Sequence, residues 1–185
     1  MRVIAGRFRS RSIWAPPGSD TRPTSDRLRE TIFNVLAPVI DGANFLDLYA
    51  GSGAVGIEAL SRGAASVTFV ESNKKAARAI RDNLASLAIT AGADIVEQPA
   101  ARSIAQLAAA KRIYDIIFLD PPYAMEGQYE AALTALAGST VLNADTVVIA
   151  EHTKHFRPED HYGSLAVYRR LQQGDAALAF YRLSQ

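Results

Sequence analysis

Residues 45–56, FLDLYAGSGAVG, place a short apolar run directly before a glycine-rich turn. The apolar run predicts a buried β-strand, and the alanine-rich stretch after the turn predicts a helix. Gly51, Gly53 and Gly56 match the spacing G-x-G-x-x-G that joins the first strand and helix of a Rossmann-like unit. Glycines at these places let the backbone approach a ligand closely. The stretch therefore predicts an α/β fold that binds an adenosine-containing ligand across its strand ends.

The rest of the chain repeats this strand–helix alternation. Apolar runs of buried-strand type occur at 67–70, 94–96, 113–119 and 147–149, and helical stretches at 54–61, 74–87, 100–110 and 128–137. Two further runs, 165–171 and 177–183, flank a turn at Gly174 and predict an antiparallel hairpin. We therefore expect a Rossmann-like, mostly parallel sheet of seven strands that carries helices on both faces and ends in this hairpin.

The composition of the 185 residues, with 49% hydrophobic and 21% charged residues, is that of one globular domain with a core. Cysteine is absent, which excludes disulfides and thiolate metal sites and favours a reducing compartment. No apolar run has membrane-spanning length, and the early arginines are not typical of a signal peptide. We expect a cytoplasmic monomer without membrane attachment or bound metal.

Charge is unevenly distributed along the chain. Residues 1–30 contain seven arginines against three acids, although the whole chain has a net charge of only +1. Residues 3–17 alternate apolar and basic side chains like a strand or hairpin, and Ser25 or Asp26 is placed to cap a following helix. We expect 1–41 to form a basic extension, poor in core residues, that docks a polyanion, and 42–185 to form the catalytic domain.

Two carboxylates indicate which adenosine ligand fits. Asp47 lies inside an apolar strand, where an unpaired carboxylate would be costly. A pyrophosphate gains nothing from this charge, whereas an ammonium and a sulfonium group do. Glu71 follows the next strand, where a carboxylate can accept hydrogen bonds from ribose hydroxyls. These residues predict S-adenosylmethionine as the cofactor, bound by Asp47, Gly51, Gly53 and Glu71; the alternative is that Asp47 only binds loop amides.

The run 113–119 ends in Asp120-Pro121-Pro122-Tyr123. Ligands of open parallel sheets lie beyond the carboxyl ends of the strands, so this turn should face the same crevice as the glycine loop. An exocyclic amine of a base is a poor nucleophile because its lone pair is delocalised into the ring. The Asp120 carboxylate and the Pro121 carbonyl could accept its two N–H groups and localise that lone pair. Tyr123 offers a ring for an extruded base, so the turn predicts methyl transfer to a base amine.

These motifs together resemble a known class. An Asp/Asn-Pro-Pro-Tyr/Phe element after a Gly-x-Gly loop marks the class I amino-methyltransferases of adenine N6, cytosine N4 or guanine N2. Residues 2–9 (RVIAGRFR), 22–27 (RPTSDR) with Arg29 and Glu30, and the hairpin at Gly174 make the chain most similar to the RsmD family. Members of that family methylate a guanine N2 in small-subunit (16S) ribosomal RNA. The resemblance covers nearly the whole chain.

The resemblance implies methyl transfer to guanine N2, with ribosomal RNA or the assembling small subunit as partner. It implies that Asp120, Pro121 and Tyr123 take the base, and that Arg7, Arg9, Arg11, Arg22, Thr24 and Arg27 contact RNA. The chain departs from the family pattern after the third strand. Where relatives place an Asp or Asn that accepts from the adenine amino group, Pro99 stands here, so the Ala100 N–H and apolar walls would bind adenine.

Other interpretations stay open. Adenine-N6 or cytosine-N4 DNA methyltransferases share the Pro-Pro turn but usually carry a larger target-recognition segment. Protein-amide methyltransferases usually begin this turn with Asn, and a non-catalytic cofactor-binding subunit that docks RNA would not need the intact turn. His152, His155 and His161 lie close in sequence and are expected to be solvated loop residues rather than metal ligands. Glu151 ends the fifth apolar run and could face the crevice, but the sequence assigns it no role.

Overall fold

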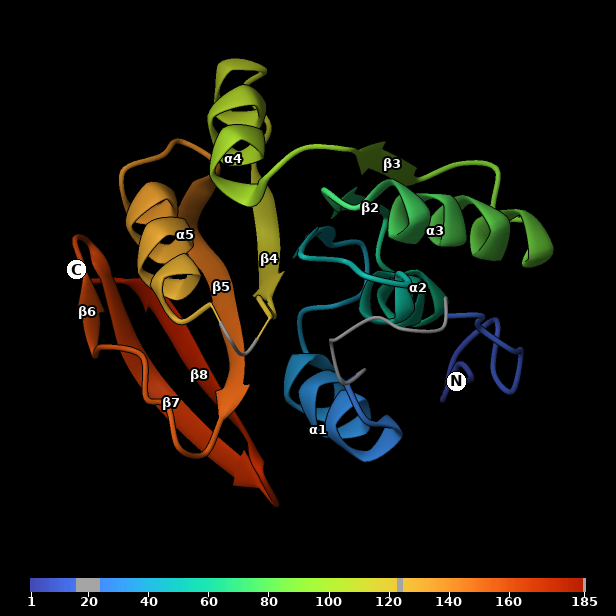
Figure 1. Ribbon diagram of the computed structural model, residues 1–185, viewed down its shortest axis with the longest axis horizontal. Coiled ribbons are helices and arrows are strands. Elements are labelled where there is room, and N and C mark those ends of the chain that lie inside the picture. The colour runs from blue at the N-terminus through green and yellow to red at the C-terminus, as the bar shows by residue number, and fades with distance from the viewer. Residues whose placement is uncertain (16–23, 123–124, 185) are drawn as a thin grey trace.

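The computed structural model describes residues 1–15, 24–122 and 125–184, and their strands form one eight-stranded sheet of order β3-β2-β1-β4-β5-β8-β7-β6 (Figure 1). The strands are β1 (Asn44–Leu48), β2 (Ser66–Val70), β3 (Ala93–Val96), β4 (Tyr114–Leu119), β5 (Leu142–Thr153), β6 (His161–Tyr162), β7 (Leu165–Gln173) and β8 (Ala176–Leu183). Strands β1 to β5 pair in parallel, and β8 joins β5 in the antiparallel sense. The expected mostly parallel sheet with an antiparallel end is confirmed.

One strand prediction differs from the structure. The sheet has an eighth strand, β6, which is only two residues long and therefore too short to show an alternating pattern. The segment 3–17 was expected to form a strand or hairpin, and its described part forms a short hairpin-like turn: an antiparallel bridge joins Arg2 and Ser12, and Val3 N donates a backbone hydrogen bond of 2.9 Å to Arg11 O. Residues 16 and 17 lie outside the described residues.

Within the described ranges, five helices cover the sheet: α1 (Asp26–Leu36), α2 (Ala54–Ser61), α3 (Lys74–Ser86), α4 (Ala100–Ala109) and α5 (Gly127–Ala137). The side chain of Ser25 accepts a hydrogen bond from Leu28 N and caps α1, as the sequence indicates. Of the described helices, none is both long and apolar enough to cross a membrane.

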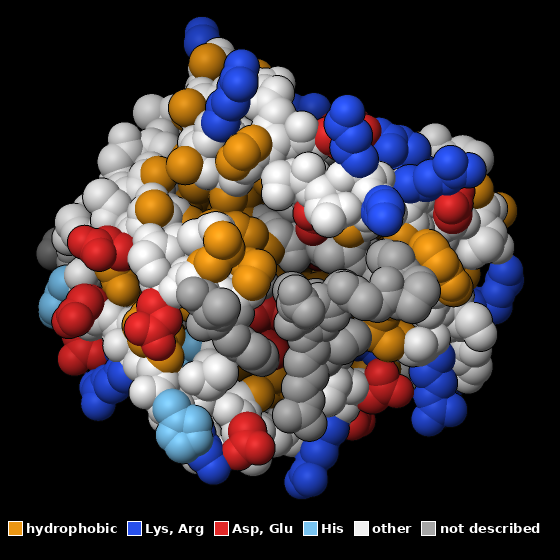
Figure 2. Space-filling model, viewed as in Figure 1, with side chains coloured by type: hydrophobic (Ala, Val, Ile, Leu, Met, Phe, Trp, Pro, Cys, Tyr) orange, Lys and Arg blue, Asp and Glu red, His pale blue; other side chains and the backbone are white. Residues whose placement is uncertain are grey.

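The hydrophobic core lies in two layers, one on each face of the sheet. Phe45 of β1 packs with apolar side chains of α1, α2 and α3, whereas its neighbour Leu46 packs with those of α4 and α5. This division follows from the alternation of side chains along a strand. Lys and Arg side chains gather on the surface near α3, and Asp and Glu side chains gather near α5 (Figure 2).

The first 15 residues lie beside α2 (Figure 1) and are bound to it more tightly than their sequence indicates. Val3 and Ile13 are buried in the same core as α1, α2 and α3. The carboxylate of Glu58 in α2 accepts hydrogen bonds from Ile4 N at 2.8 Å and Ala5 N at 3.0 Å. At Gly6 a Cβ atom would lie 1.9 Å from a backbone oxygen of α2, so only glycine allows this approach.

Candidate active site at the carboxyl ends of the strands

Three carboxylates face one side of the sheet where its central strands end. Asp47 belongs to β1, Glu151 to β5, and Asp120 directly follows β4. Each lies two residues beyond a side chain of the α1–α3 core layer, so all three point to that face. The last paired residues of β4 and β5 are Leu119 and Ala150, which places Asp120 level with Glu151.

Asp47 is 1% exposed and caps the first turn of α2 from the neighbouring strand. Its Oδ2 accepts a hydrogen bond of 3.0 Å from Gly56 N, while the N-cap residue Gly53 has no side chain to offer. Burial raises the pKa of Asp47 to about 7; the Gly56 hydrogen bond opposes this shift and the charge of Glu71 adds to it. A buried carboxylate with this pKa gains strongly from a cation placed beside it.

Glu71 fastens the glycine loop to the end of β2. Its Oε2 accepts from Gly51 N at 2.8 Å and its Oε1 from Asn73 N at 2.7 Å. A carboxylate has about four acceptor positions, so two remain for hydroxyl groups of a ligand.

The glycines of the loop have different structural roles. Gly51 has φ +55°, and a Cβ there would meet nothing within 4 Å, so its backbone borders open space. A Cβ on Gly56 would lie 2.3 Å from the Phe69 ring, so this glycine permits the packing of α2 on β2. Tyr49, at the start of the loop, also has a left-handed φ of +79°. Such strain in a non-glycine residue is typical of functional sites, and no sequence pattern indicates it.

The end of β3 carries an acceptor that sequence reasoning missed. Helix α4 begins at Ala100, whose N–H belongs to the first turn and so lacks a partner within the helix. Two residues earlier, Oε1 of Gln98 is buried, and among the described residues it has no hydrogen-bond partner. A donor and an acceptor therefore stand close together in sequence at the strand end where Pro99 replaces the expected Asp or Asn.

Asp120 is partly exposed and sits beside Pro121, which is buried. Burial raises the pKa of Asp120 well above its usual range, the charges of Glu151 and Asp47 add to the shift, and a hydrogen bond from Thr24 opposes it. Tyr123, the predicted stacking residue, lies outside the described residues.

Thr24 and Glu151 connect the start of α1 to this corner. The Thr24 hydroxyl donates a hydrogen bond of 2.8 Å to Oε2 of Glu151, and the two residues are 7% and 1% exposed. The structure thus places Thr24 in the interior, where it holds a carboxylate, rather than on a surface open to RNA. The position of Glu151 at a strand end was the only sequence signal for its presence here.

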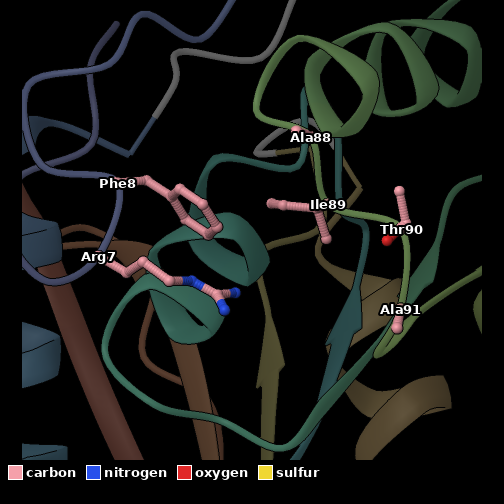
Figure 3. A pocket seen from close by; sticks show the side chains of 6 residues that line it. All are labelled: Arg7, Phe8, Ala88, Ile89, Thr90 and Ala91. Atoms are coloured by element: carbon pink, nitrogen blue, oxygen red, sulfur yellow. The ribbon is translucent and has the colours of Figure 1, made fainter.

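The arginines that were predicted to contact RNA are more widely spread than the three carboxylates. Arg7, Arg9, Arg11 and Arg27 are exposed, whereas Arg22 lies outside the described residues. The Arg7 guanidinium lies 4.4 Å from the centroid of the Phe8 ring, and both line a cavity of about 340 Å³ with residues 88–91 (Figure 3). Because 88–91 precede β3, this cavity lies near the amino end of that strand, whereas the carboxylates lie toward the carboxyl ends of the central strands.

Comparison with known proteins identifies the family. The model of a family described as "Conserved hypothetical protein 95" matches residues 1–182. The chain is 38% identical over 182 residues to the Bacillus subtilis protein YlbH, covering 98% of each. It is also 38% identical over 151 residues to the Escherichia coli K12 protein named ribosomal RNA small subunit methyltransferase D, covering 82% of this chain and 74% of the relative. The chain belongs to this methyltransferase D family.

Solved structures agree with this family. The Escherichia coli protein yhhF superposes with a TM-score of 0.85 at 35% identity, covering 99% of this chain and 97% of that one. A protein from Thermus thermophilus gives a TM-score of 0.84 at 28% identity, covering 97% and 98%. A methyltransferase solved with SAH shares the fold at a TM-score of 0.72 and 14% identity, covering 89% and 50%. Membership of the methyltransferase D family confirms the RsmD-like resemblance, the class I fold and S-adenosylmethionine as the cofactor.

Proposed function

We propose that this methyltransferase D protein transfers the methyl group of S-adenosylmethionine to the exocyclic N2 of a guanine in small-subunit ribosomal RNA. The observation that carries the proposal is the pair of carboxylates, Asp120 and Glu151, that stand level at the ends of β4 and β5. They lie on the same face of the sheet as Asp47, which caps the helix after the glycine loop.

The residues present fit the cofactor. The buried Asp47 suits its ammonium group, the open backbone at Gly51 allows close passage, and Glu71 keeps acceptor positions for the ribose hydroxyls. At the adenine end, Oε1 of Gln98 can accept from the amino group and the Ala100 N–H can donate to a ring nitrogen. When bound, the cofactor supplies an electrophilic methyl group on a sulfonium.

The two acceptors support guanine over the other bases. Guanine carries a ring N–H next to its exocyclic amine, whereas adenine and cytosine carry a bare ring nitrogen there. A corner in which Asp120 and Glu151 are both ionised can accept from both guanine groups, but it offers a bare ring nitrogen no donor. This pairing favours guanine N2 over the adenine-N6 and cytosine-N4 alternatives.

Asp120 and Pro121 then act on the amine. A carboxylate oxygen of Asp120 and the carbonyl oxygen of Pro121 accept its two N–H groups, which turns the nitrogen lone pair toward the methyl carbon. As the N–C bond forms, the C–S bond of the sulfonium would break and leave a neutral thioether; the nitrogen then becomes acidic and Asp120 takes the proton it loses. The raised pKa of Asp120 suits it to hold that proton.

The extension 1–41 docks the RNA in this proposal. Arg7, Arg9, Arg11 and Arg27 are exposed and can contact phosphates, while Thr24 contributes from inside by holding Glu151. The partner is ribosomal RNA, either free or in the assembling small subunit, in the cytoplasm.

The test is methyl transfer from labelled S-adenosylmethionine to 16S ribosomal RNA and to small-subunit particles, followed by identification of the modified nucleoside. The expected product is N2-methylguanosine. Label in N6-methyladenosine or N4-methylcytosine, or methylation of DNA in preference to RNA, would overturn the proposal. The Asp120→Ala protein is the matched control, because label that it transfers as fast as the wild type would come from a contaminating enzyme.

A further inference from the structure

Trp14 is the chain's one tryptophan and the most exposed large hydrophobic side chain among the described residues, with 55% of its surface accessible. Its neighbour Ile13 is only 2% exposed and packs in the core. Neighbouring residues therefore differ sharply in burial: Ile13 is packed in the core while the Trp14 indole is open to solvent.

A buried amide fixes the backbone at the same place. Asn83 of α3 is 3% exposed, and its Oδ1 accepts a hydrogen bond of 2.9 Å from Trp14 N. Its Nδ2 donates to Trp14 O at 2.8 Å and to Ser52 O at 2.9 Å. Ser52 lies between the loop glycines Gly51 and Gly53. The amide of Asn83 thus binds the exposed tryptophan and the cofactor loop at once.

The segment that carries Trp14 is basic. Residues 1–15 contain four arginines and no acidic residue, and Arg7, Arg9 and Arg11 are exposed. Arg11 is itself anchored, because it donates a hydrogen bond of 2.8 Å to Ser86 O at the end of α3. An exposed indole on a basic segment, of which Arg11 is fixed to the end of α3, complements a partner that offers flat apolar rings on a negative backbone.

We propose that Trp14 is a stacking platform for an unpaired base of the RNA substrate, held beside the cofactor loop by Asn83. Single-stranded nucleic acid is bound in this way, by aromatic rings that take bases and cations that follow the phosphates. This inference depends on the proposed function only in that the substrate is RNA. It does not depend on which base is methylated. Since Trp14 lies beside the cofactor loop, the stacked base is a near neighbour of the target nucleotide.

The single tryptophan makes a direct test possible. Titration of the wild-type protein with a short unstructured RNA should quench its tryptophan emission, because the stacked base contacts the indole. The same RNA annealed to its complement has no free bases and should quench far less. Equal quenching by both forms, or an unchanged emission spectrum at saturating single strand, would overturn the platform.

Variants separate stacking from folding. Trp14→Ala should weaken binding of the unstructured RNA and raise KM for ribosomal RNA by about 5- to 150-fold, whereas Trp14→Phe should recover part of the loss. Tyr168→Ala is the matched control, because Tyr168 is 47% exposed on β7 and should not affect RNA binding. The Kd for S-adenosylmethionine should stay unchanged in all three. An unaltered RNA affinity and KM in Trp14→Ala would sink the inference.

Asn83 is tested as a positioning residue. In Asn83→Ala, the anisotropy of the Trp14 emission should fall, because the backbone loses both hydrogen bonds. Circular dichroism checks that α3 persists, and unchanged anisotropy in a folded variant would show that Asn83 does not hold the ring. Nucleoside analysis keeps this inference apart from the proposed function: guanine methylation with normal KM in Trp14→Ala would remove the platform alone, and methylation of another base would remove only the guanine assignment.

Discussion

The hydroxyl of Thr24 donates a hydrogen bond of 2.8 Å to the carboxylate of Glu151, across 127 residues of sequence. The same hydroxyl has one proton and can alternatively donate it to Asp120, which lowers the pKa of Asp120, whereas the charge of Glu151 raises that pKa. The segment before α1 and the end of β5 therefore act in opposite directions on the residue that we propose to receive the base amine.

This opposition predicts two shifts of opposite sign in the pH profile of kcat. Asp120 must be ionised to accept both an N–H and a proton, so kcat should rise with pH through its pKa. Thr24→Val removes the stabilising hydrogen bond and should move this rise to higher pH, while Thr24→Ser should leave it in place. Glu151→Gln removes a repelling charge and should move the rise to lower pH. Shifts in the same direction for Thr24→Val and Glu151→Gln would contradict the arrangement.

Asp120 itself should be needed for chemistry and not for cofactor binding. We expect Asp120→Ala to lower the single-turnover rate by roughly 10²–10³, the usual effect of removing one positioned electrostatic group. Calorimetry should show nearly unchanged S-adenosylmethionine binding, since Asp47, Gly51 and Glu71 are intact. Wild-type turnover in this variant would remove Asp120 from the mechanism.

Asp47 should couple cofactor binding to proton release. Its pKa is raised to about 7, and the ammonium group of the cofactor would lower it again. Binding at pH 7 should therefore release protons and tighten as pH rises through about 7. Calorimetry in buffers of different ionisation enthalpy measures this release, which Asp47→Asn should abolish. Equal proton release by the variant would assign the proton to another group.

The same pKa has a consequence for stability. The folded-state pKa of Asp47 lies above the ordinary value of 3.8. The contribution of Asp47 to the free energy of unfolding is therefore complete below about pH 4 and is lost as pH rises to about 7. Above that pH, the ionised Asp47 lowers the free energy of unfolding by on the order of 4 kcal/mol. Asp47→Asn should keep an acceptor for Gly56 N and avoid this cost. Without cofactor, it should melt at a higher temperature than the wild type at pH 8 but not at pH 4.

The sequence predicts the parts of the site that depend on local patterns. The glycine loop, Asp47 and the turn at Asp120 could be found because strand runs and fixed spacings place them at strand ends. The hydrogen-bond partners of Asn83 and Glu151 could not be predicted, because these bonds join segments far apart in the chain and depend on how α1 and α3 pack. Asn83 in particular stands in an amphipathic helix, where a polar residue is normally solvated.

The basic arm is better tested by point changes than by deletion. Removing residues 1–14 would take Val3 and Ile13 out of the core, at about 1.5–3 kcal/mol each, and would strip two hydrogen bonds from Glu58. Replacing Arg7, Arg9 and Arg11 by alanine avoids this loss. Each lost phosphate contact should lower the slope of log affinity against log salt by about 0.7–0.9. Arg157→Ala, on the far side of the sheet, should leave the slope unchanged, and an unchanged slope in the triple variant would exclude the arm as the docking surface.

Gln98 should recognise the adenine amino group. Its Oε1 is buried without a hydrogen-bond partner among the described residues, and a carbonyl oxygen left in this state destabilises the protein until a donor reaches it. Gln98→Leu keeps the approximate size of the side chain and removes the acceptor. We expect it to weaken binding of S-adenosylhomocysteine by about 2- to 12-fold, the range for one neutral hydrogen bond.

The ligand that tests this assignment is S-inosylhomocysteine, which has an oxygen in place of the amino group. The wild type should bind it less well than S-adenosylhomocysteine, and the Gln98→Leu variant should bind both alike. If Gln98→Leu keeps the full preference for the adenine form, the amino group is recognised elsewhere, and the Ala100 N–H with the apolar walls must account for adenine binding without Gln98.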